Sequence, residues 1–199
     1  MIERLVAWVE KWAGHHHAHK ALALVAFVES SFFPIPPFVL VVAMLIHEKK
    51  PSWVKIAIVG MLSSVAGGVF GYFIGKFLYG YIGAPLVAFY GLTDQVASLG
   101  QVFKDHVFIT ILLASLSPLP YKVFTLSAGL FSVNLVSFIL ASLVGRSIRF
   151  LVVAYLADRY GIRAKKFILE QQRIAVVTTV VIVLVALIYF FGYPLVTNN

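Results

Sequence analysis

Two long apolar stretches of this chain, residues 20–47 and 107–131, are each interrupted by prolines. Proline removes a backbone donor and clashes with the preceding helical turn, so neither stretch can form one straight helix. Each stretch is therefore predicted to form two short helices joined by a break. The prolines at these breaks are Pro34, Pro36 and Pro37 in the first stretch and Pro118 and Pro120 in the second.

The composition indicates that these stretches lie in a membrane. Of the 199 residues, 61% are hydrophobic and 12% are charged, a ratio that no single water-soluble core of this size can hide. Residues 53–79 and 133–157 are long enough to cross about 30 Å of hydrocarbon at about 1.5 Å per residue, and residues 174–193 are predicted as a C-terminal transmembrane helix. The net charge of +8 is expected to mark cytoplasmic loops, and no nucleic-acid partner is expected.

Two further segments, 1–13 and 85–105, combine helically spaced apolar residues with charged ones, which predicts helices that lie in the membrane interface. The chain is therefore expected to be a single all-α integral membrane domain over residues 1–199. Its parts are an N-terminal interfacial helix with a histidine-rich loop (1–19), a core (20–161) and the C-terminal transmembrane helix (174–193).

The proline breaks belong to a pattern that occurs twice. Pro34 and Pro36 align with Pro118 and Pro120 at one constant offset, and Gly67 and Gly83 align with Gly145 and Gly161 at another. This repetition predicts two re-entrant proline-broken hairpins, each followed by a transmembrane helix. If each hairpin enters and leaves on one side, the span between them gives the copies opposite orientations, an inverted repeat typical of transporters. The excess of Lys and Arg on the N-terminal side then predicts a cytoplasmic N-terminus.

Glu29, one helical turn before the first break, is the strongest indication of function. Ionising a carboxylate within hydrocarbon is costly, and such residues usually face a cavity or a charged partner. Glu29 is therefore a candidate proton-coupling residue. The alternative is a protonated or capped glutamate that only hydrogen-bonds the backbone freed by Pro34.

Three basic residues and one serine are candidate substrate-binding residues. Arg146 and Arg149 are three residues apart, hence on one helix face, where their guanidinium groups could grip one phosphate. Lys122 and Ser117, at the second break, add a movable charge and a hydroxyl group. The alternative for the arginines is that they snorkel to the membrane edge and anchor the protein to lipid headgroups.

The breaks also expose backbone groups that favour an anion. Half-helices that begin after Pro37 and Tyr121 would point their positive N-terminal ends toward the middle of the membrane. Non-helical backbone at that depth is tolerated only where protein or water surrounds it. A wet cavity that accepts an anion is therefore expected between the breaks.

Two other patterns have simpler interpretations. A histidine tract could collect a metal ion, but no nearby carboxylate or cysteine closes a coordination shell, so no metal or other cofactor is expected. The tract consists of His15, His16, His17 and His19. A stripe of glycines at four-residue spacing indicates close helix packing. It consists of Gly67, Gly71 and Gly75. No nucleophile stands beside a base in a plausible pattern, so the chain is not expected to be an enzyme.

Three motifs occur in order along the chain: ESSFFPIPP, SPLPYKVFTLSAG and GRSIRF. With these motifs, residues 20–161 resemble the DedA family of membrane proteins, also called the VTT or SNARE-associated Golgi protein domain. The resemblance implies two oppositely inserted re-entrant hairpins that face each other. It also implies functional roles for the acid of the first hairpin, at Glu29, and for the arginine near the later glycine, at Arg146.

The chain departs from the family pattern at two positions. Phe38 stands where many members have a second acid, just after the first proline cluster. Ser115 stands where many have an arginine, and Lys122 is the nearest basic substitute. These departures leave the coupling ion and the exact substrate open.

The resemblance implies lipid handling, because bacterial relatives are linked to the return of undecaprenyl phosphate across the inner membrane with ion gradients and eukaryotic relatives to phospholipid scrambling. We therefore expect a transporter of the bacterial inner membrane that moves an anionic lipid headgroup, a polyprenyl phosphate, while Glu29 exchanges a proton. Passive phospholipid scrambling, transport of a small solute or ion, and a non-transporting scaffold are the alternatives. The expected partners are membrane lipids and protons, and the oligomeric state is left open.

Overall fold

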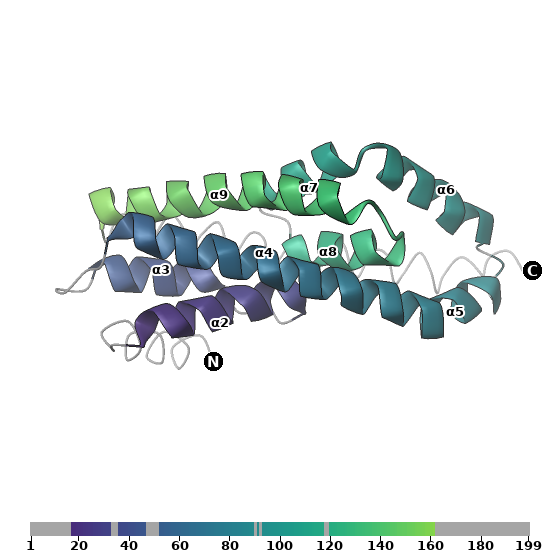
Figure 1. Cartoon of the computed structure of the whole chain (residues 1–199), viewed down its shortest axis with the longest axis horizontal. Coiled ribbons are helices and arrows are strands. Elements are labelled where there is room, and N and C mark those ends of the chain that lie inside the picture. Colours follow the sequence, from purple (N-terminus) through teal and green to yellow (C-terminus); the bar gives the residue numbers. More distant parts are fainter. Residues whose placement is uncertain are drawn as a thin grey trace, which may run out of the picture.

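The computed structural model describes residues 17–32, 36–46, 52–89, 91, 93–117 and 120–161. This part of the chain is built from helices and contains no strand (Figure 1). The segments 1–13 and 174–193, together with His15 and His16, lie outside the described residues, so what the sequence predicts for them stays a prediction.

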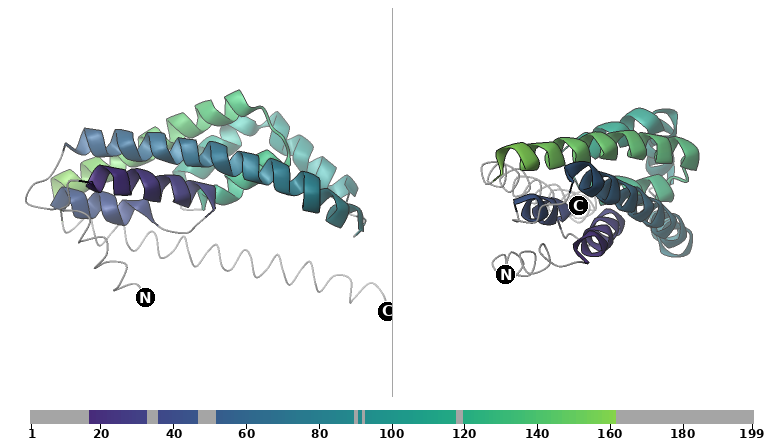
Figure 2. Two further views of the ribbon diagram at one scale, coloured as in Figure 1. Left: turned by 60° about the horizontal axis from the view of Figure 1, so that its bottom comes forward. Right: turned by 60° about the vertical axis from the view of Figure 1, so that its left-hand side comes forward.

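The first proline-containing stretch forms two helices, as predicted. Helix α2 (Ala18–Ser31) and helix α3 (Pro37–Ile46) lie side by side and run in opposite directions (Figure 1 and Figure 2). Pro37 occupies the first position of α3, where a helix has no intrahelical use for a backbone N–H and where the fixed φ of proline suits the helix. The break between the helices therefore follows from the prolines themselves.

One long helix runs through the molecule. It comprises α4 (Trp53–Leu78), the π-helical turn η1 (Tyr79–Gly83) and α5 (Ala84–Phe89). Together they form a helix of 37 residues, Trp53–Phe89, that is long and apolar enough to cross a membrane. The predicted span 53–79 is confirmed, and the helix continues well beyond it.

The prediction of one interfacial helix over 85–105 is wrong at its beginning. The first of these residues belong to α5, which continues the long helix, and the chain turns only at Gly91, where φ is +65° and glycine is favoured. At the end of η1 the N–H of Ala84 bonds to the oxygen of Tyr79, one residue further back than in an α-helix. Pro85, which has no N–H to offer, follows this wider turn without breaking the helix.

The second proline-containing stretch is also broken. Helices α6 (Thr93–Asp105) and α7 (Val107–Leu116) meet at an angle of 84°, and α8 (Tyr121–Leu130) follows the second break. Helix α9 (Leu135–Tyr160) packs along α4 and is long and apolar enough to span a membrane, which confirms the predicted span 133–157. The described residues thus contain two candidate spans, or three if the bent pair α6–α7 counts as one.

Helix α4 lies at the centre and contacts α2, α8 and α9. Glycines make these contacts close: a methyl group at Gly67 would overlap the backbone oxygen of Phe27 in α2, and one at Gly75 would overlap the backbone oxygen of Leu126 in α8. Gly71 lies between them and faces both helices. The glycine stripe therefore lies where one central helix holds both broken pairs.

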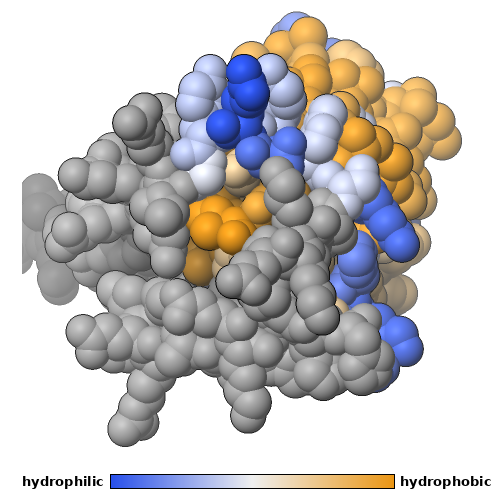
Figure 3. Space-filling model, turned by 90° about the vertical axis from the view of Figure 1, so that its left-hand side faces the viewer, coloured by the Kyte–Doolittle hydropathy of each residue, from blue (hydrophilic) through white to orange (hydrophobic). Residues whose placement is uncertain are grey.

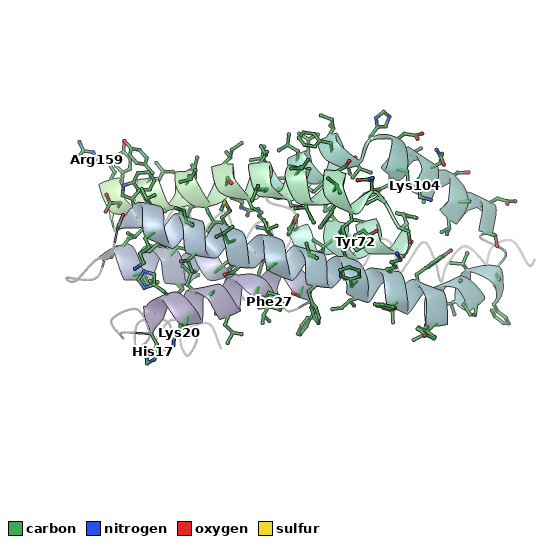
Figure 4. The ribbon with its side chains drawn as sticks, in the orientation of Figure 1. His17, Lys20, Phe27, Tyr72, Lys104 and Arg159 are labelled. Carbon is green, nitrogen blue, oxygen red and sulfur yellow. The ribbon has the colours of Figure 1, made fainter. Side chains whose placement is uncertain are left out.

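The surface of the described helices suits lipid. Charged or polar side chains lie near the ends, with His17, Lys20 and Arg159 at one end and Lys104 toward the other (Figure 4). Seen from the first of these ends, hydrophilic residues occupy part of the near face and hydrophobic residues cover the adjoining flank (Figure 3). Large apolar side chains are exposed between the ends, among them Leu62, Phe70, Phe77, Leu140, Val144 and Val152. An apolar surface of this extent on spanning helices is what a bilayer covers, so the chain is an integral membrane protein.

Candidate functional site

The predicted acid and one predicted arginine meet where α2 ends and α9 passes. Arg146 Nη2 lies 3.4 Å from Glu29 Oε2, and the two side chains are 1% and 17% exposed. Glu29 lies in the last turn of α2, just before the first break, and Arg146 lies near the middle of α9. The sequence predicts separate roles for these residues, and the structure brings them into one ion pair.

Ser30 connects this ion pair to the neighbouring helices. Its hydroxyl group donates to Glu29 Oε2 at 3.2 Å, accepts from Arg146 Nη2 at 3.2 Å and lies 2.7 Å from Ser64 Oγ of α4. The backbone oxygen of Ser30 accepts a hydrogen bond from the Thr125 hydroxyl group of α8 at 3.2 Å. Groups from α2, α4, α8 and α9 therefore converge at the ion pair.

Tyr121, the first residue of α8, covers one face of Arg146. The guanidinium carbon of Arg146 lies 3.8 Å from the centroid of the Tyr121 ring, a cation–π arrangement. The Tyr121 hydroxyl group donates to Ser142 Oγ of α9 at 2.5 Å, which fixes the ring in place. Arg146 Nε is buried and has no hydrogen-bond partner among the described residues. The guanidinium group therefore keeps donor capacity that its protein neighbours do not use.

Arg149 has a different target from Arg146. Its Nη1 donates to the backbone oxygens of Ser117 at 2.8 Å and Ser115 at 3.4 Å. These carbonyl groups lie at the C-terminal end of α7, where a cation complements the helix dipole. The guanidinium carbon also lies 4.9 Å from the centroid of the Phe38 ring. The contacts of Arg149 thus stabilise the second break. The prediction that Arg146 and Arg149 bind one phosphate together is not supported by these contacts.

Lys122 and Ser117 complete the predicted set. Lys122, the second residue of α8, is half-buried and close enough to Glu29 for an electrostatic attraction, and Arg149 is attracted to the same carboxylate. The Ser117 hydroxyl group donates to the Ala114 backbone oxygen at 3.1 Å, so it is engaged with α7. Three cations therefore face one carboxylate, which leaves an excess of positive charge around Glu29.

The prolines and half-helix ends lie as the sequence predicts where the structure describes them. Helix α3 begins at Pro37, directly after Pro36, and helix α8 begins at Tyr121, directly after Pro120. The N-terminal ends of both half-helices, which carry partial positive charge, therefore lie at the breaks. The remaining break prolines, Pro34 and Pro118, lie outside the described residues.

Two serines make matching contacts in the two halves of the chain. Ser31 and Ser115 each donate to the backbone oxygen 4 residues earlier at 2.7 Å. Ser31 also donates to the backbone oxygen of Gly67 at 3.0 Å, and a methyl group at Gly145 would overlap Ser115. The two serines are related by the offset of the proline pairs, and the two glycines by the offset of the repeated glycines.

The described histidines of the tract lie at the end of α2 opposite to Glu29. His17 precedes the helix, and His19 lies in its first turn rather than in the loop predicted for 1–19. Burial, with a smaller contribution from Lys55, lowers the pKa of His19. Within the described residues no group of three potential metal-binding side chains occurs. For the whole tract, the expectation that no metal is bound stays a prediction.

A cavity of about 310 Å³ lies apart from the ion pair, between α6, α7 and α8. Its lining is mainly apolar, with His106, Thr110 and Ser127 as the polar members. This cavity is not the wet cavity predicted between the breaks, and that one stays a prediction. At the ion pair itself, the protein covers Arg146 almost completely.

Five polar residues of the site were not predicted from the sequence: Ser30, Ser64, Tyr121, Thr125 and Ser142. Two of them had a local signal, because Ser30 is adjacent to Glu29 and Tyr121 begins the half-helix after the second break. Ser64 and Ser142 are related by the offset of the repeated glycines. A polar residue that recurs inside two apolar spans was the available signal for both.

Comparison with known proteins decides the family. Residues 33–159 match the family model of the VTT domain, a range that includes both breaks and almost all of α9. The chain belongs to the VTT-domain (DedA) family. An uncharacterized protein of Haemophilus influenzae is 35% identical to this VTT-domain protein over 162 residues, which are 79% of this chain and 83% of the relative. A Histophilus somni protein, also described as uncharacterized, is 32% identical over 157 residues, 79% of this chain and 80% of the relative. No solved structure matches the chain.

Proposed function

We propose that this VTT-domain protein is a transporter that moves a lipid with an anionic headgroup, a polyprenyl phosphate, across the bacterial inner membrane. The observation that carries the proposal is the ion pair between Glu29 and Arg146, which joins the end of α2 to the middle of α9. A buried ion pair adds little net stability, because desolvation offsets the attraction between the charges. Ionisable groups inside membrane proteins typically mark the path of a charged substrate or a proton.

The charge around the ion pair supports an anionic substrate. Lys122, Arg146 and Arg149 are all attracted to Glu29, so the cations outnumber the acid. The half-helices α3 and α8 add two positive N-terminal ends at the breaks. A phosphate headgroup fits this field because guanidinium groups bind phosphate oxygens in pairs.

Proton coupling is proposed for Glu29. Among the residues named at the site, Glu29 is the acid, and the neighbouring hydroxyl groups of Ser30 and Ser64 lie 2.7 Å apart. Ser30 also donates to the carboxylate. A carboxylate in contact with hydroxyl groups and with a cation is suited to exchange a proton as its partner moves.

We further propose that the two broken helix pairs form an inverted repeat in the membrane. The matching contacts of Ser31 and Ser115 support this topology, as does the placement of α4 between both pairs. Lys20 and Arg159 lie at one end of the molecule and Lys104 toward the other (Figure 4). In the sequence, further basic residues come shortly after α3 and α9: Lys49, Lys50, Arg163, Lys165 and Lys166. This bias supports a cytoplasmic position for that end and for the N-terminus.

The test is lipid transport in liposomes that contain the purified protein. A fluorescent short-chain polyprenyl phosphate is placed in both leaflets, a pH gradient is imposed, and the fraction accessible to an external quencher is followed. Transport driven by the gradient that is lost in Glu29→Gln and in Arg146→Gln supports the proposal. Lys104→Gln, a change of an exposed lysine on α6, is the matched control and should transport as the unmodified protein does.

Two outcomes would contradict the proposal. Movement of zwitterionic phospholipids without any gradient, equally fast in Glu29→Gln, would identify a passive scramblase. No lipid movement under any gradient, with a well-folded protein, would favour a solute transporter or a scaffold.

A further inference from the structure

Arg146 makes weaker contacts than a buried guanidinium group is able to make. Its Nη2 lies 3.4 Å from Glu29 Oε2 and 3.2 Å from Ser30 Oγ, whereas charge-assisted N–H···O bonds are usually about 2.7–2.9 Å long. Its Nε is buried without a hydrogen-bond partner among the residues that the structure describes. A guanidinium group presents its donors as a fork that fits two oxygens of one anion. The present contact with Glu29 uses one prong of that fork.

The surroundings of Arg146 require some anion to be present. The side chain is 1% exposed, and the Tyr121 ring covers one of its faces. Removing the carboxylate without replacement would leave a buried charge uncompensated, which is strongly destabilising. The carboxylate can therefore leave only if another anion takes its place.

The charged groups around Glu29 are cations. Helix α9 contributes Arg146 and Arg149, and α8 contributes Lys122 and the Tyr121 hydroxyl group. Helix α3 has no ionisable residue, and the lysines of α4 lie near its ends. Proton uptake by Glu29 would thus leave cations facing a neutral acid, which favours the arrival of an anion.

We propose that the oxyanion headgroup of a lipid replaces the Glu29 carboxylate at Arg146 when Glu29 accepts a proton from water, so that one proton is bound with each headgroup. The inference rests on the proposed transport function and names its coupling step. The neutral acid leaves Nη2, and two headgroup oxygens occupy Nη2 and the unused Nε. Ser30 Oγ, 3.2 Å from Nη2, keeps its bond to the guanidinium group during the exchange. For a headgroup with one negative charge, the charge next to Arg146 is the same before and after the exchange.

The experiment measures proton uptake on binding. The full chain is placed in phosphatidylcholine nanodiscs and titrated calorimetrically with decyl sulfate, whose single negative charge is constant over the pH range used. Titrations in two buffers of different ionisation enthalpy give the number of protons taken up. We expect uptake approaching one proton per decyl sulfate at high pH, and in that range the affinity should rise about tenfold for each unit by which the pH is lowered.

Variants locate the exchange. Glu29→Gln should bind decyl sulfate tightly at every pH with no proton uptake, and Arg146→Gln should lose binding. Lys104→Gln should behave as the unmodified protein does. If Glu29→Gln fails to fold, the proton count of the unmodified protein decides alone, and binding without proton uptake at any pH would overturn the inference.

Inorganic sulfate distinguishes the source of the anion. Weak binding of inorganic sulfate beside tight binding of decyl sulfate supports a lipid headgroup, whereas equal affinities would overturn that assignment in favour of a free oxyanion. Gradient-driven transport of polyprenyl phosphate together with pH-independent binding would overturn the exchange and leave the proposed function standing. If the unmodified protein neither transports polyprenyl phosphate nor binds decyl sulfate, the proposed function itself is contradicted.

Discussion

The two broken helix pairs share their packing and differ in their charges. In each pair a serine bonds the backbone one turn earlier and lies against a glycine of a long helix, with Ser31 and Gly67 in the first half and Ser115 and Gly145 in the second. The charged groups are not duplicated, because α2 carries Glu29 whereas α7 has no ionisable residue. Contacts that hold helices together thus occur twice, and the acid and the bases are divided between the halves.

The second positions of the two half-helices show the same difference. Phe38 of α3 and Lys122 of α8 are related by the offset of the proline pairs. Phe38 is 5% exposed and lies against the guanidinium group of Arg149, where its ring face attracts the cation. Lys122 is half-buried and is attracted to Glu29. With Phe38 at this position, the site holds one acid instead of two and is therefore more positive.

The largest loss of transport and stability is expected when Arg146, the partner of Glu29 from the second half, is removed. Arg146→Gln should abolish gradient-driven transport and lower the free energy of unfolding by about 3–5 kcal/mol, because Glu29 is left without its partner. Liposome transport and denaturant unfolding measure the two effects. Retained transport in Arg146→Gln would show that the divided charges do not carry the function.

A smaller loss of stability is expected when the helix contacts that occur in both halves, at Gly67 and Gly145, are disturbed. Gly67→Ala and Gly145→Ala should each lower the free energy of unfolding by about 1–3 kcal/mol, because the added methyl group overlaps a neighbouring helix. Gly80→Ala is the matched control, since nothing lies within 4 Å of a methyl group there. A loss of stability in one half alone would show that the packing of the halves is not equivalent.

The second break can be made to resemble the first. Lys122→Phe should raise the KM for the anionic lipid about fivefold, which corresponds to a loss of about 1 kcal/mol of attraction. The protein should remain folded, because Lys122 is only half-buried and the related position of α3, Phe38, already holds a phenylalanine at a helix start. Transport rates at several lipid concentrations give KM, with Lys104→Gln as control. An unchanged KM would exclude Lys122 from substrate binding.

The smallest effect concerns the outer end of the first pair. Burial and Lys55 hold the pKa of His19 below its usual value of about 6.5. The folded protein therefore favours neutral His19, and this contribution to stability is present above about pH 6.5 and is lost as the pH falls toward the lowered pKa. A titration of His19 by NMR should give the lowered value, and Lys55→Gln should raise it. A value at or above 6.5 would contradict the burial of His19 near Lys55.

The positions of the breaks and of the long helices were predictable, because prolines and uninterrupted apolar segments determine them locally. The prolines located both breaks and the start of α3, and the uninterrupted apolar segments located α4 and α9. Prediction failed around Pro85, because a local π-helical turn absorbs a proline that would end an α-helix, and no spacing rule announces such a turn.

The site was predictable only in part. Glu29 and Arg146 were recognisable because a charge inside an apolar segment needs a partner, but their pairing depends on how distant helices cross. The target of Arg149, the backbone oxygens of Ser117 and Ser115, could not be deduced from its three-residue spacing to Arg146. Spacing defines a helix face, and the packing of the fold decides what that face meets.

A double-mutant cycle tests most directly whether the acid of the first half and the base of the second form one site. The free energy of unfolding is measured for the unmodified chain, Glu29→Gln, Arg146→Gln and the double variant. We predict an interaction energy of about 1–3 kcal/mol, because either single change leaves the other charge without its partner. Effects that add to within about 0.5 kcal/mol would contradict the pairing on which this account depends.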